Sequence, residues 1–327
     1  MNLIGVDVDS QTLVCERRFN HKSFPIKTFA NTTAGHRKFI RWATQRGATA
    51  RVAMESTGVY SIPFALALSQ EKGIGVSVVN PRAIKKFADA TLQRGKTDAM
   101  DASCIAEYLE RMPFKEWTPP DKIVMELQHI TRRTVQLGSD LTREKSRHAA
   151  AKQLGNLGRV VANDTAVSAR HIQRRIDALE AKALSIVATH THLQQQLDTL
   201  VSVVGIGNRT GLRILAELNS LPSDMKGKQW VAAAGLDPRP YESGTSTKKT
   251  RSISRAGNRY LRDALYFPAL VASRQDEHVS AYYQKLIAAG KKPKQAIVAI
   301  MRKMLLALWG MFNSGTSWDG SKFYKMP

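Results

Sequence analysis

Four acidic residues in the first third of the sequence have the types and positions that could hold a divalent cation. Asp7 stands in an apolar run, Glu55 ends a second apolar run, and Asp98 and Asp101 stand three residues apart in "KTDAMDA". Mg²⁺ prefers oxygen ligands, which carboxylates, water and substrate phosphates supply. Phosphodiester chemistry with two metals needs a cluster of such carboxylates, with the ions about 3.5–4 Å apart. The four acids therefore predict a site for Mg²⁺, with Mn²⁺ as a substitute.

Each of these acids also has a purely structural interpretation. Thr97 or Asp98 can cap a helix, and acids in a first helical turn are favoured by the helix dipole. Asp7 can face outward from its strand, and Glu55 can be a solvated charge at a strand end. The interpretations differ in what they predict, because the loss of a cap lowers stability whereas the loss of a metal ligand abolishes chemistry. Taken singly, each of the four acids, Asp7, Glu55, Asp98 and Asp101, favours the structural interpretation, whereas their layout together favours the metal site.

A second stretch, "DPRPYESGTSTKKTRSISRAGNRYLRDAL", contains a candidate nucleophile. Ser243 precedes Gly244, a residue that permits a sharp turn and close backbone approach. A serine hydroxyl needs a base or a metal-polarised partner before it can attack. From spacing alone a turn residue is the favoured interpretation, and Ser246, Ser252 and Ser254 compete with Ser243.

The same stretch carries a run of cations that is suited to phosphate contact. Between Glu242 and Asp263 there are six basic residues and no acid: Lys248, Lys249, Arg251, Arg255, Arg259 and Arg262. The spacing of the last three predicts that they line one helix face. A solvated basic face is the alternative.

Gly205 and Gly207, in "VVGIG", stand between two segments with helical periodicity. This turn resembles a helix-hairpin-helix, which aims backbone N–H groups and a helix N-terminus at a phosphate. A glycine-capped helix junction is the alternative. The turn is therefore a candidate nucleic-acid contact.

The overall charge points to a polyanionic partner. The chain has 327 residues with 49 Lys+Arg against 27 Asp+Glu, a formal charge of +22. Chains this basic commonly bind nucleic acid, although a basic housekeeping enzyme is an alternative. Two cysteines are too few for a disulfide framework and fit a reducing compartment. We see no leader sequence, and the apolar stretch "AIVAIMRKMLLALWGMF" is too short and too charged to span a bilayer, so we expect a cytoplasmic protein without a membrane partner.

The elements that must position these residues fall into three predicted regions. Residues 1–118 show three strands followed by alternating helix and strand, which predicts an α/β domain. Residues 119–198 are helical in period and predict an extended hairpin that forms a coiled coil, or alternatively a helical bundle capping the first domain. Residues 199–327 form a mainly α third unit that carries the serine. An acid on a first strand, an acid ending a later strand and two acids on a following helix is the layout of ribonuclease-H-like nucleases.

Seven motifs in this order and spacing give the chain a resemblance to a known family. They are "IGVD", "MESTGVY", "VVNP", "KTDAMDA", "VVGIG", "AAAGLDPRPYESG" and "SRAGNRYLRDALY". The chain resembles the DEDD-type insertion-sequence transposases, relatives of the Piv-type DNA invertases that include the bridge-RNA-guided recombinases. The resemblance runs over nearly the whole chain and is weakest between about residues 120 and 195.

The resemblance implies a specific activity and specific roles. It implies a RuvC-like, ribonuclease-H-fold domain at the N-terminus, a coiled-coil middle and a C-terminal transposase domain. It carries the metal-binding tetrad onto Asp7, Glu55, Asp98 and Asp101 and the nucleophile onto Ser243. It also implies an active site shared between protomers of a dimer or tetramer that acts on donor and target DNA in the nucleoid. A structured guide RNA from the same element, the bridge RNA, would pair with both DNAs.

Two other functions remain open at this stage. A hydrolytic, structure-specific nuclease resembling a Holliday-junction resolvase needs the four acids but no serine. An architectural nucleic-acid-binding protein needs the positive charge but none of the acids. A covalent protein–DNA adduct would distinguish the transposase from the hydrolytic nuclease. Metal-dependent cleavage would distinguish it from the architectural protein.

Overall fold

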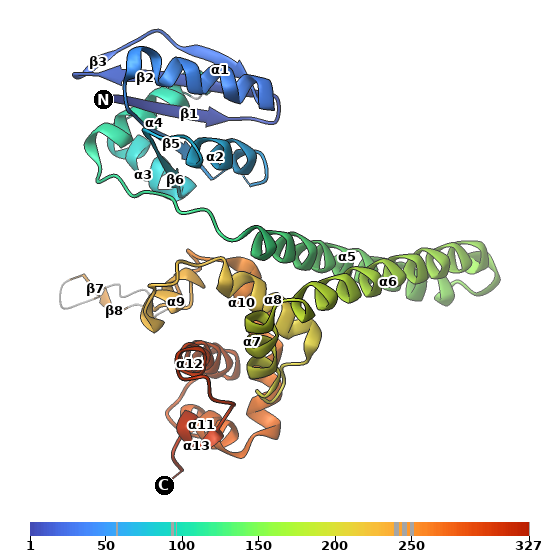
Figure 1. Ribbon diagram of the computed structural model, residues 1–327. Helices are drawn as coiled ribbons and strands as arrows, with labels where there is room; N and C mark the ends of the chain where they lie inside the picture. Colours follow the sequence, from blue (N-terminus) through green and yellow to red (C-terminus); the bar gives the residue numbers. More distant parts are fainter. Residues whose placement is uncertain are drawn as a thin grey trace. The chain divides into compact units, whose positions relative to one another are not determined.

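The computed structural model consists of two compact units, Met1–Pro119 and Pro120–Pro327 (Figure 1). It describes residues 1–56, 58–92, 95, 97–238, 242–243, 247–248 and 252–326. For residues 242, 243, 247 and 248 only the backbone is described. The units are considered separately below.

The first unit is a mixed sheet with helices on both faces. Its strands are β1 (Asn2–Val8), β2 (Thr12–Phe19), β3 (Lys22–Ser23), β4 (Lys27–Ala30), β5 (Ala50–Glu55) and β6 (Ile74–Val79). Its helices are α1 (Thr33–Ala43), η1 (Gln45–Gly47), α2 (Ser61–Ser69), α3 (Pro81–Ala90) and α4 (Asp98–Arg111). The strand order is β3-β2-β1-β5-β6, with β4 also paired to β2. β1, β5 and β6 are parallel, β2 is antiparallel to β1, and the predicted α/β organisation is confirmed.

The alternation of β1 sorts its side chains between two cores. Ile4, Val6 and Val8 face the larger core, which also contains Phe39 of α1 and Phe64 of α2. The other face of the sheet forms a second core with α3 and α4. Each face of the sheet is thus covered by its own pair of helices.

α4 lies directly on the backbone of β1 because Gly5 has no side chain. A Cβ at Gly5 would lie 2.2 Å from the backbone N of Ala106 and 2.4 Å from the carbonyl O of Ala102. Only glycine leaves room for a helix backbone at this separation. The contact fixes how closely α4 approaches the strand that carries Asp7.

The second unit is helical in the described residues, apart from one short strand pair. Its elements are α5 (Lys122–Gln153), η2 (Gly155–Gly158), α6 (Arg159–Ala188), α7 (Thr191–Val201), α8 (Asn208–Asn219), α9 (Gly227–Ala233), β7 (Glu242–Ser243), β8 (Thr247–Lys248), α10 (Arg259–Gln275), α11 (Glu277–Ala288), α12 (Pro293–Ser314) and α13 (Gly320–Phe323). α5 and α6 lie side by side as a long hairpin (Figure 1). The helical prediction for this part of the chain is confirmed, and the remaining helices pack around one apolar core.

A buried carboxylate joins three parts of the second unit. Glu217 of α8 is 1% exposed. Its two oxygens accept hydrogen bonds from Nε and Nη2 of Arg132 on α5, at 2.7 and 2.9 Å. Its Oε2 also accepts from Nε2 of Gln128 at 3.0 Å and from Nδ2 of Asn258, which caps α10, at 2.6 Å. The desolvation of Glu217 is therefore offset by a full set of donors.

α12 is the one described helix that is long and apolar enough to cross a membrane by length and composition. Its 22 residues correct the expectation from the sequence that this stretch is too short. Its apolar side contributes Ile300, Met304 and Leu308 to the core of the second unit. Burial against other helices accounts for its composition.

We predict that Gly5→Ala lowers the free energy of unfolding of the first unit by at least about 1–3 kcal/mol, since overpacked sites cost this much. The added methyl group must displace helix backbone rather than a flexible side chain. Denaturant titration gives the loss, and hydrogen exchange of α4 peptides locates it. Gly138→Ala on α5, where a Cβ meets nothing within 4 Å, is the control. Equal stabilities of the Gly5 variant and wild type would contradict the close packing.

We predict that Glu217→Gln destabilises the second unit by about 2–4 kcal/mol, because it removes one partner of a largely buried ion pair. The estimate is below the range for fully buried pairs, since the Arg132 side chain is 33% exposed. Glu126→Gln, an exposed position on α5, should change stability by less than about 0.5 kcal/mol. Thermal unfolding of both variants measures the difference, and similar effects would show that the network contributes little.

Candidate active site

Two of the four predicted acids lie side by side at the end of the first unit's sheet. β1 and β5 are parallel neighbours, and the last pair in their register is Val6 opposite Met54. Asp7 and Glu55 are the next residues on the two strands. Because side chains alternate along a strand, Asp7 shares the face of Gly5, which faces α4. Glu55 shares the face of Ala53, which packs in the same core as α4.

The direction of α4 brings the other two acids toward the same end of the sheet. Near its C-terminus, Glu110 accepts a hydrogen bond at 3.0 Å from Arg18, which pairs with Leu3. About two turns earlier, Ser103 donates to Glu16, which pairs with Gly5. Moving toward the N-terminus of α4 therefore means moving along β1 from Leu3 toward Asp7. The first turn of α4, with Asp98 and Asp101, lies beyond Ser103 in this direction.

The electrostatics of one thiol support this placement. Burial raises the pKa of the Cys104 thiol, and the negative charges of Asp101 and Glu107 raise it further. Arg18 acts in the opposite direction, and the charge of Glu55 on β5 again raises the pKa. Acids from α4 and from the end of β5 thus act on the same side chain.

Helix capping does not require either acid of α4. Thr97 is the N-cap residue, and its hydroxyl oxygen accepts a hydrogen bond from the backbone N of Met100 at 3.2 Å. Asp98 is exposed, and Asp101 is half-buried. Thr97 is therefore the capping residue. The structural role that remains for the two carboxylates is the favourable interaction with the helix dipole.

The donor chemistry of these residues suits Mg²⁺. All four groups are carboxylates, the hard oxygen ligands that this ion prefers. Asp7, Glu55 and Asp101 are half-buried, so each keeps access to solvent. In the part of the chain that the structure describes, no three His, Cys, Asp or Glu side chains are grouped closely enough to hold one ion. The convergence of the four acids on a cation therefore stays a prediction.

The predicted nucleophile lies on a short strand pair of the second unit. Ser243 of β7 pairs through its backbone with Thr247 of β8, and its side chain lies outside the described residues. The base of this segment is fixed by two backbone hydrogen bonds, from Ser254 N to Asp237 O at 2.8 Å and from Arg255 N to Gly235 O at 3.1 Å. The described residues on the two sides of this segment are thus bonded to each other.

Among the competing serines, Ser254 has a structural role. Its hydroxyl donates to a carboxylate oxygen of Asp237 and accepts from the backbone N of Ala256. Ser252 is exposed, and Ser246 lies outside the described residues.

The predicted basic helix face is wrong. α10 begins only at Arg259, because Asn258 caps it, and Arg255 lies before the helix in a left-handed conformation with φ +52°. Arg262 donates to the carbonyl O of Ala234 at 2.9 Å, so it braces the fold. Arg259 is exposed beside Asp263. Lys249 and Arg251 lie outside the described residues, and so does the side chain of Lys248.

The two predicted glycines of the α7–α8 turn have different roles. Gly205 has φ +92°, and a Cβ there would lie 2.9 Å from the carbonyl O of Pro268, so packing alone demands glycine. Gly207 is the N-cap of α8 and faces open space. Its backbone is the part of this turn that is open to a ligand.

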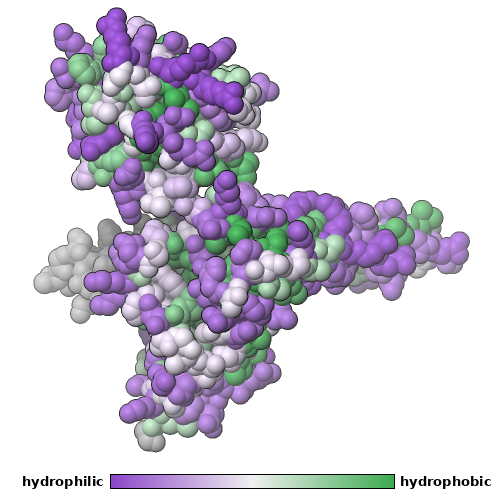
Figure 2. All heavy atoms as spheres, in the orientation of Figure 1, coloured by the Kyte–Doolittle hydropathy of each residue, from purple (hydrophilic) through white to green (hydrophobic). Residues whose placement is uncertain are grey.

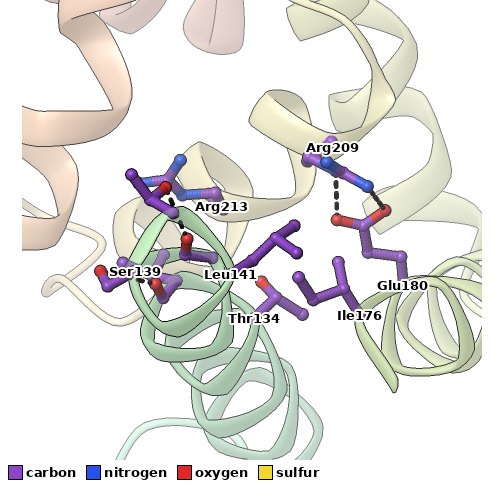
Figure 3. A pocket seen from close by; sticks show the side chains of 10 residues that line it. Thr134, Ser139, Leu141, Ile176, Glu180, Arg209 and Arg213 are labelled. Atoms are coloured by element: carbon purple, nitrogen blue, oxygen red, sulfur yellow. Dashed lines mark hydrogen bonds and ion pairs between the residues drawn. The ribbon is translucent and has the colours of Figure 1, made fainter. Parts of the chain in front are cut away.

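A polar cavity of about 380 Å³ lies at the root of the helical hairpin, between α5, α6 and α8. It was not predicted from the sequence. There Nη2 of Arg209 lies 2.8 Å from Oε2 of Glu180 (Figure 3). Nε of Arg213 is buried without a hydrogen-bond partner among the described residues, and burial lowers the pKa of Arg213. The positive charge of Arg209 is balanced by Glu180 within the second unit. The i, i+4 spacing of these two arginines is the one signal that the sequence offers.

Comparison with known proteins adds independent evidence. A family model described as "Transposase" matches residues 4–154, and a model described as "Transposase IS116/IS110/IS902 family" matches residues 197–284. The first match contains all four acids, and the second contains Ser243.

Similar proteins cover almost the whole chain. The pilin gene-inverting protein of Moraxella bovis is 27% identical over 322 residues, 97% of each chain. The 42 kDa protein of insertion element IS900 from Mycobacterium paratuberculosis is 24% identical over 377 residues, 94% of this chain and 91% of that protein. The 44.8 kDa protein of insertion element IS116 from Streptomyces clavuligerus is 24% identical over 375 residues, with 94% and 90% covered. The chain belongs to the insertion-sequence transposases of the IS110/IS116 type, a family that also includes the pilin gene-inverting DNA invertases.

Proposed function

We propose that this transposase cuts and rejoins DNA with a cation-binding edge on its first unit and a serine nucleophile on its second. The observation that carries the proposal is the placement of Asp7 and Glu55 on adjacent strand ends, with the acidic first turn of α4 directed toward the same end. The mixed sheet with a helix packed on its first strand supports a ribonuclease-H-like, RuvC-like fold for this unit.

Strand exchange without net hydrolysis follows from the groups available. Mg²⁺ or Mn²⁺ bound by the four acids would neutralise the scissile phosphate and ease proton loss from the serine hydroxyl. Oγ of Ser243 attacks phosphorus, so an O–P bond to the serine forms and the bond to one deoxyribose oxygen breaks. The released oxygen takes up a proton as the serine loses one. A hydroxyl of the partner strand then attacks the phosphoserine and regenerates the serine, so bond energy is conserved.

We infer that the active protein is a homo-oligomer, a dimer or a tetramer, in which the acids of one protomer work with the serine of another. The end of the α5–α6 hairpin exposes apolar side chains (Figure 2), including Leu154 at 62%, Leu157 at 90% and Val160 at 78%. A second copy of the chain can cover these residues through coiled-coil pairing. As part of this proposal, the hairpin region, 119–198, and the serine-bearing region, 199–327, are two separate domains.

We further propose that donor and target DNA are selected by a structured guide RNA of the same element. The formal charge of +22 suits a chain that holds more than one nucleic acid. The open backbone at Gly207 and the cations near Ser243 are candidate phosphate contacts, which supports a helix-hairpin-helix role for the α7–α8 turn. The site of action is the nucleoid within the cytoplasm.

One observation favours the hydrolytic nuclease as a second candidate. All four acids lie within residues 1–119, a compact unit. A hydrolytic enzyme resembling a Holliday-junction resolvase could therefore work without the second unit. It would leave free DNA ends and no covalent intermediate.

We predict that Asp98→Asn and Asp101→Asn each abolish DNA cleavage, because each removes a proposed ligand of the cation, whereas nucleoprotein assembly survives. Because Thr97 is the cap, each variant should lose at most about 1 kcal/mol of stability. Cleavage of a labelled element end measures the first effect, and gel shift measures the second. Asp89→Asn, at an exposed position of α3, is the control. Retained cleavage would return both acids to a dipole role.

We predict that Ser243→Ala abolishes covalent protein–DNA adducts and leaves DNA binding at the wild-type level. Denaturing electrophoresis of a trapped reaction detects the adduct. Ser252→Ala changes an exposed serine of the same stretch and should form the adduct normally. Adduct formation by the Ser243 variant would contradict the nucleophile, and cleavage without any adduct in wild type would support the hydrolytic nuclease.

A further inference from the structure

We propose that the α1 side of the first unit is a binding surface for the phosphate backbone of duplex DNA. This inference rests on the proposed function, since it concerns the DNA that reaches the acidic end of the sheet. The surface, called the basic face, consists of six cations from β2, β4, α1 and η1: Arg17, Lys27, Arg37, Lys38, Arg41 and Arg46.

The basic face has no acid of its own to neutralise it. No Asp or Glu occurs between Lys27 and Met54. Arg37, Lys38 and Arg41 are exposed on α1. In the described part of the first unit, the cations of the ion pairs are Arg18, His21 and Arg111, none of which belongs to the basic face. Its charges are therefore available to an external polyanion.

Aromatic rings, rather than carboxylates, hold two of these cations in place. Cζ of Arg17 lies 4.8 Å from the ring centre of Phe24 and 5.1 Å from that of Trp42. Nζ of Lys27 lies 5.4 Å from the ring centre of Phe29 and 5.7 Å from that of Trp42. A cation–π contact orients a cation without cancelling its charge. The part of the basic face that lies on β2 and β4 is thus held by aromatic rings and keeps its positive charge.

One helix on the opposite face of the sheet, α4, is acidic, whereas its neighbour α3 carries Arg82, Lys85 and Lys86 against Asp89. α4 carries four acids, Asp98, Asp101, Glu107 and Glu110, against one cation, Arg111. A polyanion that approaches the unit is therefore attracted to the α1 side and repelled by α4 unless a cation is bound there.

The basic face begins at the end of the sheet that carries the catalytic acids. Asn31, just before α1, donates from Nδ2 to the carbonyl O of Asp9, two residues after Asp7, at 2.8 Å. At the other end of α1, the carbonyl O of Ala43 accepts from Nδ2 of Asn2 at 2.9 Å. α1 thus runs from the acid-bearing end of the sheet to its opposite end.

The length of α1 suits a short stretch of duplex. Its 11 residues span about 16 Å, the rise of about five nucleotides along one strand at about 3.4 Å each. Arg37, Lys38 and Arg41 can therefore contact phosphates of the DNA that leads to the cut. We assign duplex DNA rather than RNA because the strand that reaches the acids is the one cut under the proposed function.

The test is the salt dependence of duplex DNA binding by the full chain without divalent cations. The variant is Arg37→Gln, Lys38→Gln and Arg41→Gln combined. The slope of log Kobs against log salt is negative, and each lost phosphate contact reduces its magnitude by about 0.9. The triple variant should therefore show a slope that is less steep by up to about 2.7. The matched control combines Arg82→Gln, Lys85→Gln and Lys86→Gln, which are exposed on α3 at the other face of the sheet. It removes the same charge and should leave the slope unchanged.

Two outcomes would overturn the proposal. Equal slopes for the two triple variants would mean that only net charge matters. A loss of affinity for duplex RNA of equal length, with DNA binding retained, would make the basic face an RNA surface. Circular dichroism shows whether both variants fold. Cleavage by wild type is measured separately, so a chain that does not cut would refute the proposed function and leave the binding result standing.

Discussion

The placement of the acids proposed to hold the cation depends on the contact between α4 and the backbone of β1 at Gly5. A side chain at Gly5 would overlap the backbone of Ala102 and Ala106. The pairings of Ser103 with Glu16 and of Glu110 with Arg18 then direct its first turn toward the end of the sheet that carries Asp7. Thr97 fixes where the helix starts, so the register of α4 and its approach to the sheet are set by two small residues.

Hydrogen bonds and an ion pair to β2 engage part of the charge on α4. Ser103 and Glu110 hold α4 to β2 through Glu16 and Arg18. These pairings use the acidic side of α4 against the one part of β2 that faces it. Among the described residues of the first unit, no cation of α1 belongs to an ion pair, and the sheet separates α1 from α4. Under the proposed function, this arrangement would attract the duplex to the α1 side, and a bound cation would offset the negative charge of α4.

Much of the first unit could be predicted from the sequence, because alternation in "LIGVDV" and Pro81 at a helix start are local signals. Placing Asp7 beside Glu55 needed only the order of the strands. The direction of α4 could not be predicted, since it depends on pairings with Glu16 and Arg18 that lie about 90 residues away. The basic helix face failed for a local reason: Gly257 and Asn258 form a helix start that the i, i+4 spacing of the arginines obscured.

Glu217 shows how the second unit links its hairpin to the serine segment. Asn258 bonds Glu217 through its side chain and the carbonyl O of Ala233 through its backbone N, at 2.6 Å in each case. Ala233 ends α9, just before the segment that carries Ser243, and Asn258 follows it. Arg132 bonds the same carboxylate from the root of α5. Glu217 therefore links the hairpin to Asn258, and Asn258 links the two ends of the serine segment, so pairing of two hairpins would also set the separation of their serine segments. In a shared active site, the geometry that brings a serine to the partner's acids is then inherited from the hairpin, and the serine segment itself can stay short.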